Sequence, residues 1–209
     1  MILIPQYRTA RRAAAAAADI TVIEELSQGT SAGATLTFSF AGTPADNEKL
    51  VAVVCNVTAA PSTVPSGFSI VASHTATADR VYVYEKVAAS ESNSYAWIGA
   101  ARFAVMMARL SSGTYDTSGT NSGVAVASLI VPSAGITVPN NSYVVAGWRS
   151  SSSANVTSVN NSFSIKISAT GWRSCIASRK YTTGGSSEQV TGTTGGTPNI
   201  GGLMAVFKP

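Results

Sequence analysis

Residues Gly67 to Trp97 read GFSIVASHTATADRVYVYEKVAASESNSYAW, and this stretch decides the fold class. It contains three segments in which apolar residues alternate with Ser, Thr or charged residues, and short polar turns separate these segments. A period of two places apolar side chains on one face of a β-strand and polar side chains on the other. The pattern therefore predicts consecutive antiparallel strands with one face in a core and one face in water.

Further strand candidates lie on both sides of this stretch. They are residues 34–40, 49–57, 102–110, 124–132, 142–150, 162–169 and 172–181, and the chain closes on the apolar LMAVFKP. Residues 49–57 are almost entirely apolar, which predicts a central strand that is covered on both faces. A Gly-, Thr- and Ser-rich stretch at 182–202 separates these candidates from the closing strand. Short strands without a helical period after residue 26 predict an all-β antiparallel sandwich of jelly-roll type, and no internal repeat is evident in the sequence.

The first 33 residues differ from the rest of the chain, and we expect an N-terminal anchoring arm at 1–33 before a sandwich domain at 34–209. Six consecutive alanines favour a short helix within residues 8–18, and Thr21 with Glu24 fits a capping box for a further helical turn. So short a helix is marginal in water and would be ordered by docking onto another surface, whereas a frayed terminus without a role is the alternative. The residues expected to mediate assembly are Tyr7, Arg8, Arg11, Arg12, Ile20, Val22, Ile23 and Leu26.

Charge is scarce throughout the chain. Charged residues make up 11% of the 209 residues and the net charge is +4, against about 25% charged residues in an average soluble protein. The basic residues are scattered except in the arm, whereas nucleic-acid binders gather them on a patch or stripe. The arm is too weakly apolar for a membrane span or an export signal. We therefore expect neither a nucleic-acid partner nor a membrane partner.

Residues for catalysis or metal binding are also scarce. His74 is the only histidine, so a Ser-His-acid arrangement would have to recruit it, and the carboxylates lie mostly in expected turns. The two cysteines, Cys55 and Cys175, lie in apolar strand-like runs, where small buried side chains are favoured over a disulfide bridge. The sequence therefore predicts no enzymatic activity, no metal site and no cofactor.

The quoted stretch also carries a resemblance to a known family. Pro65, Gly67 and Phe68 form a Pro-x-Gly-aromatic turn, and the segment from Tyr84 through Lys86 to Ala88 closes the strand that follows. These features resemble a β-sandwich domain of tailed-bacteriophage structural proteins, over residues 34–150. The resemblance implies a virion protein that assembles with copies of itself and with other virion proteins. Without the family, the same aromatic residues read as sheet packing.

We therefore expect a non-enzymatic phage virion structural protein, located in the virion and assembled in the host cytoplasm. It would be a capsid decoration or cement protein, or a tail, collar or fibre component. The alternative is a carbohydrate-binding module that recognises a host-surface glycan, because sandwiches can bind sugars through aromatic side chains. The candidate glycan contacts are Tyr115, Trp148 and Trp172, which lie near expected strand ends. A structural reading, in which the tryptophans belong to the core, is favoured over this one.

Overall fold

The computed structural model describes residues 19–30, 33–56, 59–75, 80–99, 102–152, 154–169 and 173–209. These residues form strands and connecting loops and contain no helix. The first half of the chain contains β1 (Val22–Thr30), β2 (Ala34–Ser39), β3 (Lys49–Asn56), β4 (Ser69–His74), β5 (Arg80–Val87), β6 (Ser94–Gly99) and β7 (Phe103–Leu110). The second half contains β8 (Thr114–Gly123), β9 (Ser128–Val138), β10 (Tyr143–Ser150), β11 (Val156–Val159), β12 (Ser164–Ala169), β13 (Ser174–Lys180), β14 (Gly185–Thr194) and β15 (Ile200–Lys208).

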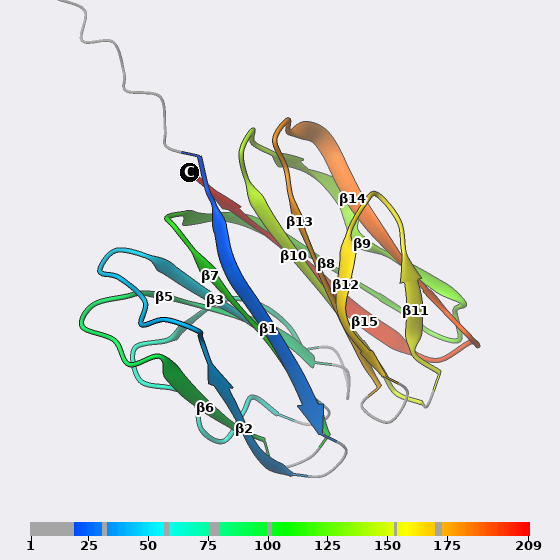
Figure 1. Cartoon of the computed structure of the whole chain (residues 1–209). Helices are drawn as coiled ribbons and strands as arrows, with labels where there is room; N and C mark the ends of the chain where they lie inside the picture. Colours follow the sequence, from blue (N-terminus) through cyan, green and yellow to red (C-terminus); the bar gives the residue numbers. More distant parts are fainter. Residues whose placement is uncertain are drawn as a thin grey trace, which may run out of the picture.

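The strands build four stacked antiparallel sheets (Figure 1). The first inner sheet has the order β1-β7-β3-β5-β4, and the two-stranded sheet β2-β6 covers its outer face. The second inner sheet has the order β12-β13-β10-β15-β8, and the sheet β11-β14-β9 covers its outer face. The inner faces of the two five-stranded sheets pack against each other. An antiparallel all-β sandwich, as predicted, is therefore confirmed, whereas these strand orders do not confirm the jelly-roll type.

Three hydrophobic layers separate the four sheets, and they explain why the central strands are apolar throughout. Alternate residues of β3 point to opposite layers: Val51 and Val53 face the second inner sheet, while Ala52 and Val54 face the outer sheet. All eight residues of β3 and all eight of β10 are buried. The prediction that residues 49–57 include a central strand covered on both faces is thus confirmed.

The two halves of the chain repeat one topology. Replacing β1, β3, β4, β5 and β7 by β8, β10, β12, β13 and β15 converts the strand order of the first inner sheet into that of the second. The outer pair β2-β6 corresponds in the same way to β9-β14. Even β11, which pairs with β14, has a counterpart, because Thr63 forms an isolated bridge with Ile98 of β6. The sequence analysis did not find this repeat.

Irregularities recur at matching places in the two halves. The β4–β5 ladder shifts register between Ile70 and Ala72, and the β12–β13 ladder shifts between Ile165 and Ile167. A second shift occurs in the edge ladders β1–β7 and β8–β15, at the corresponding position. The sequence GFSIVAS at 67–73 matches SFSIKIS at 162–168 in four of seven positions. Bulges are specific features of a fold, so their recurrence supports a repeat of structure down to single residues.

The inner sheets meet through reciprocal contacts, as in the isologous interface of a twofold dimer. Strand β3 faces its counterpart β10. Strand β5 contacts β15, and the counterparts of these two strands, β13 and β7, contact each other as well. Likewise, β4 contacts β8, and their counterparts in the other half, β12 and β1, contact each other. At the centre, Gly147 occupies the register position that Val53 has in the first half. A Cβ atom on Gly147 would lie 2.8 Å from Cγ1 of Val81 and 3.2 Å from Cγ1 of Val53, so the absence of a side chain there allows the two sheets to approach.

Four strands, β1, β8, β11 and β14, are not among the strands that the sequence predicts. The predicted helical turn from Thr21 is wrong: residues 22–30 form the edge strand β1, which pairs with β7 along its length, so the first inner sheet begins at Val22. Pairing with a sheet edge overrides the local capping signal in this segment. The Gly-, Thr- and Ser-rich stretch at 182–202, for which the sequence analysis predicts no strand, contains β14. Its Ser and Thr residues are accommodated because this strand covers an outer face.

Candidate functional site

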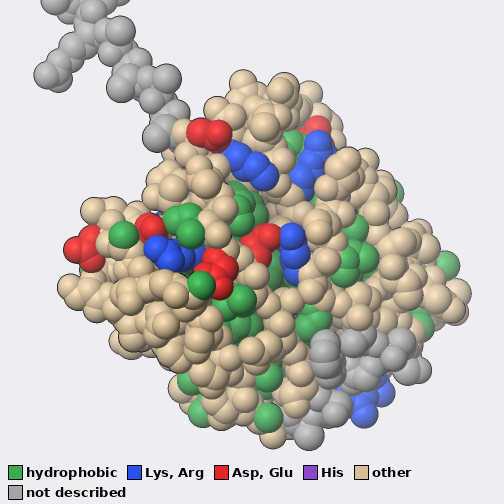
Figure 2. Space-filling model, viewed as in Figure 1, with side chains coloured by type: hydrophobic (Ala, Val, Ile, Leu, Met, Phe, Trp, Pro, Cys, Tyr) green, Lys and Arg blue, Asp and Glu red, His purple; other side chains and the backbone are tan. Residues whose placement is uncertain are grey.

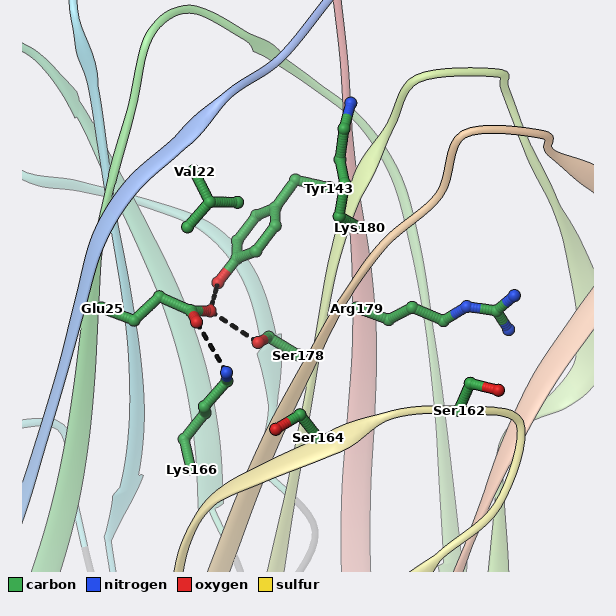
Figure 3. Close-up of a pocket in the computed structure, with 9 residues that line it drawn as sticks. All are labelled: Val22, Glu25, Tyr143, Ser162, Ser164, Lys166, Ser178, Arg179 and Lys180. Carbon is green, nitrogen blue, oxygen red and sulfur yellow. Dashed lines mark hydrogen bonds and ion pairs between the residues drawn. The ribbon is translucent and has the colours of Figure 1, made fainter.

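A pocket of about 490 Å³ opens where β1, β12 and β13 meet, at one side of the contact between the inner sheets. Most of its lining residues carry a polar group, and their aliphatic and aromatic parts also line the wall. The lining residues are Val22, Glu25, Tyr143, Ser162, Ser164, Lys166, Ser178, Arg179 and Lys180 (Figure 3). They come from strands of both inner sheets and, for Ser162, from the turn before β12, so the pocket depends on how the two halves pack.

Glu25 on β1 is the centre of a hydrogen-bond network in this pocket. The Tyr143 hydroxyl and the Ser178 hydroxyl each donate to Oε1 of Glu25 at 2.6 Å, and Nζ of Lys166 lies 2.6 Å from Oε2. All three partner side chains point toward the carboxylate in Figure 3. Ser27, also on β1, donates to the backbone oxygen of Lys166 at 2.7 Å. The edge strand of the first sheet is thereby attached to the second sheet.

The environment of Glu25 stabilises its charged form. Burial by itself raises the pKa of this carboxyl, but hydrogen bonds from Lys166, Ser178 and Tyr143 outweigh burial and hold the pKa below its ordinary value of 4.5. The pKa of the Tyr143 hydroxyl is raised well above 10 by burial and by the neighbouring carboxylate. Glu25 is therefore an anion and Tyr143 a neutral donor at neutral pH, which suits a fixed structural or binding network.

The Glu25→Gln variant tests this network. A carboxylate with a lowered pKa contributes stability above its unfolded pKa, and this contribution is lost as the pH falls through the folded pKa. We expect the variant to lower the free energy of unfolding by about 1 to 2 kcal/mol at pH 7. The difference in unfolding free energy between wild type and variant should become smaller below pH 4.5. Urea denaturation of both proteins at pH 7 and at pH 3 measures this difference. An equal loss at both pH values would contradict the assigned charge state.

The cations on the other side of the pocket have different surroundings. Arg179 forms no ion pair with any carboxylate in the described part of the chain; it stacks on Tyr181, with its guanidinium carbon 3.9 Å from the ring centroid. Its Nη1 donates to the backbone oxygen of Asn161 at 2.6 Å. The hydroxyls of Ser162 and Ser164 are exposed and make no hydrogen bond to a described residue. Figure 3 shows the Arg179 side chain extending away from Glu25, toward Ser162.

The matching place in the first half is occupied differently. By register, Glu25 corresponds to Ser118, Tyr143 to Lys49 and Ser178 to Glu85. There Lys49 pairs directly with Glu85 at 3.0 Å. Lys86, the counterpart of Arg179, pairs with Glu91 at 2.7 Å. At this place in the first half, Lys49 and Lys86 are thus neutralised by carboxylates. In the second half Lys166 and Lys180 have carboxylate partners, whereas Arg179 has none among the described residues.

The predicted assembly residues are distributed between core and surface. Tyr7, Arg8, Arg11 and Arg12 lie outside the described residues. Ile20 is fully buried, and Val22 and Leu26 pack against the hydrophobic layers of the sandwich. The side chain of Ile23 is 42% exposed. Of Ile20, Val22, Ile23 and Leu26, it is the one that is exposed to a partner.

The structure describes two of the candidate glycan contacts, Tyr115 and Trp148, and places them in different hydrophobic layers. The prediction that Trp148 is an exposed contact is wrong. Strand β10 places this side chain in the hydrophobic layer between the second inner sheet and its covering sheet, where it is 1% exposed. Tyr115 packs on Phe207 and shares a hydrogen bond with Ser118. Trp172 lies outside the described residues. Sequence reasoning missed the actual pocket, because no local signal brings Glu25 together with residues of β10, β12 and β13.

The histidine and the two cysteines of the described part are buried. No three of its His, Cys, Asp and Glu side chains are grouped as metal ligands would be. His74 lies at the end of β4 and is buried there, and burial lowers its pKa. Cys55 and Cys175 are buried and unpaired, as predicted. The described part also has no helix that meets the length and hydrophobicity of a membrane span.

Comparisons of the chain with protein-family models, with curated proteins and with solved structures found no match.

Proposed function

We propose that the protein is a non-enzymatic structural component of a tailed-phage virion. It packs against copies of itself and other virion proteins through its N-terminal arm and the edges of its sheets. In the capsid this role is that of a decoration or cement protein, and in the tail that of a collar, fibre or baseplate component. The family resemblance of the Gly67–Trp97 stretch motivates the virion setting.

The position of the exposed apolar side chains carries this proposal. Five large hydrophobic residues are exposed in the described part of the chain. Ile23, Ile70 and Ile130 lie on the edge strands β1, β4 and β9, and Val124 directly follows the edge strand β8. An edge strand with unpaired backbone groups and apolar side chains is a template for pairing with another chain. Such edges favour a protein that is covered by neighbours when it is in place.

The scarcity of charge supports the same role. Most of the face in Figure 2 carries neither basic nor acidic side chains, and these gather in a few small groups. Ser, Thr and Gly have little side-chain freedom to lose, so their surfaces are immobilised at low entropic cost. Because β3 and β10, the central strands of the two inner sheets, are buried on both faces, the body offers neighbours a fixed shape.

Deletion of residues 1–18 tests the arm. The cut stops before Ile20 and before β1, because removing either would damage the sheet. We expect the shortened chain to keep its circular dichroism spectrum and melting temperature but to be missing from purified particles. Mass spectrometry of particles assembled with full-length or shortened chain measures incorporation. A variant with Arg8, Arg11 and Arg12 replaced by Ala separates the charge of the arm from its length. Normal incorporation of the shortened chain would refute the anchoring role.

A carbohydrate-binding function is the second candidate, and the pocket beside Glu25 is the observation that favours it. This candidate no longer depends on Trp148, which is buried.

A further inference from the structure

In both halves of the chain, an amide side chain closes part of the edge of a covering sheet. Gln28 of β1 donates to the backbone oxygen of Thr37 in β2 at 2.9 Å. Asn121 of β8 donates to the backbone oxygen of Ile130 in β9 at 2.8 Å. The ladders place Gln28 and Asn121 at corresponding positions of the repeat. A backbone group that is already bonded is not free to pair with another chain, so these amides restrict pairing at β2 and β9.

The inner-sheet edge β12 is closed by its contacts with β1. Lys166 lies where the β12–β13 ladder shifts register. Its Nζ pairs with Oε2 of Glu25 at 2.6 Å, and its backbone oxygen accepts the hydroxyl of Ser27 at 2.7 Å. A charge and a bulge within an edge strand are two devices that prevent the pairing of sheet edges. Strands β1 and β12 therefore protect this side of the molecule.

Strand β4, the counterpart of β12, has none of these bonds. By register, Val71 stands at the position of Lys166, and Thr120 of β8 at the position of Ser27. In the described part of the chain, no side-chain hydrogen bond or ion pair involves any residue of β4. The β4 edge thus lacks the polar connection that occupies β12.

Strand β4 also carries no charge. Its sequence is SIVASH, and the buried His74 has a pKa that burial lowers, so its imidazole is neutral at neutral pH. The other edge strands of the two inner sheets carry Glu24, Glu25, Asp116 and Lys166. In a contact between two copies related by a twofold axis, a strand pairs with itself, so a charge near the axis faces an identical charge. This repulsion is absent at β4, which favours a second copy of the chain as its partner.

An exposed apolar side chain lies on this edge. Ile70 is 51% exposed and stands opposite Tyr84 in the β4–β5 ladder, on the outer face of the first inner sheet. Ser69 and Ser73 are also exposed, and these small side chains leave room for a neighbouring strand. Apolar surface removed from water stabilises an association. Pairing along β4 would bury Ile70 as well as satisfying the free backbone groups of the edge.

We propose that the protein forms a twofold dimer in which β4 pairs antiparallel with β4 of a second copy. The first inner sheets of the two copies then become one continuous sheet, and main-chain hydrogen bonds supply much of the affinity. The contact between two strands of six residues is small, so the dimer is in equilibrium with the monomer. This inference rests on the proposed function, because it names the edge through which copies of the chain meet. It concerns the protein in solution, so its failure leaves the incorporation test of the N-terminal arm unaffected.

Sedimentation velocity of the full-length protein over a concentration series tests the proposal. We expect the 21.3 kDa chain to convert into a species of twice this mass as the concentration rises. Hydrogen exchange followed by mass spectrometry at both ends of the series locates the contact. Amides of β4 should exchange more slowly in the dimer, whereas amides of the edge strand β9 should be unchanged.

Ile70→Lys should weaken dimerisation about tenfold or more, because two like charges would then face each other across the axis. Ile130→Lys is the matched control. Ile130 is 45% exposed on the edge strand β9, so this variant changes charge and exposed apolar surface in the same way and should dimerise like the wild type. Thermal melting of both variants shows that they are folded. A monomer at every concentration, a dimer that Ile70→Lys leaves intact, or a dimer that Ile130→Lys weakens equally would each overturn the proposal.

Discussion

Replacing Trp148 by Ala is expected to lower the free energy of unfolding by about 3 to 5 kcal/mol, the range for removing a large aromatic side chain from a core. Trp148 is 1% exposed and lies between two glycines. A Cβ atom on Gly192 or on Gly202 would come within 2.9 Å of the indole, so these residues leave the space that the ring fills. Truncation to Ala would empty that space, and the rigid strands around it cannot close it.

Urea denaturation of the wild type and of Trp148→Ala measures this loss, and Trp148→Phe is the control. Phe keeps an aromatic ring in the space and removes an indole N–H that has no partner among the described residues. We expect the Phe variant to lose less than half as much stability as the Ala variant. A change of less than about 1 kcal/mol for Trp148→Ala would be typical of a surface residue and would restore this tryptophan as a candidate for glycan contact.

The fold class was predictable because the alternating and continuous apolar patterns are local. The apolar run at Lys49–Asn56 predicts a strand that is covered on both faces, and the structure has this strand. The repeat was not predictable in the same way, since GFSIVAS and SFSIKIS share only four positions and the matching features are bulges and strand orders. Those features depend on pairing between distant strands and leave little trace in the sequence.

The pocket was beyond sequence reasoning for a related reason. Glu25 lies in a segment whose capping signal predicts a helical turn, and the pairing of β1 with β7 turns this residue toward Tyr143, more than a hundred positions away. Trp148 was proposed as a surface contact because its strand seemed to end nearby. Burial on both faces of β10 instead places it in the core.

The contact between the inner sheets makes Gly147 the most sensitive position of the interface. Gly147→Leu would drive a side chain into Val81 and Val53 of the opposite sheet, both fully buried. Overpacked cores cost about 1 to 3 kcal/mol and occasionally more, and we expect this variant to reach at least about 3 kcal/mol. Both halves should be destabilised together, because each inner sheet covers the other. Gly195→Leu is the matched control, since a Cβ atom there meets no other atom within 4 Å.

Equilibrium unfolding in urea, followed by two probes, tests most directly whether the repeated halves form one body. Trp97 reports on the first half and Trp148 on the second, so each is kept as the single tryptophan of a variant while the other two become Phe. When the unfolding curve measured by tryptophan fluorescence coincides with the curve measured by circular dichroism of the whole chain, unfolding is a single cooperative transition. We predict coincident midpoints in both variants, and a shift of the whole transition when Gly147→Leu is added. Two separate transitions, with each tryptophan following only its own half, would contradict this account.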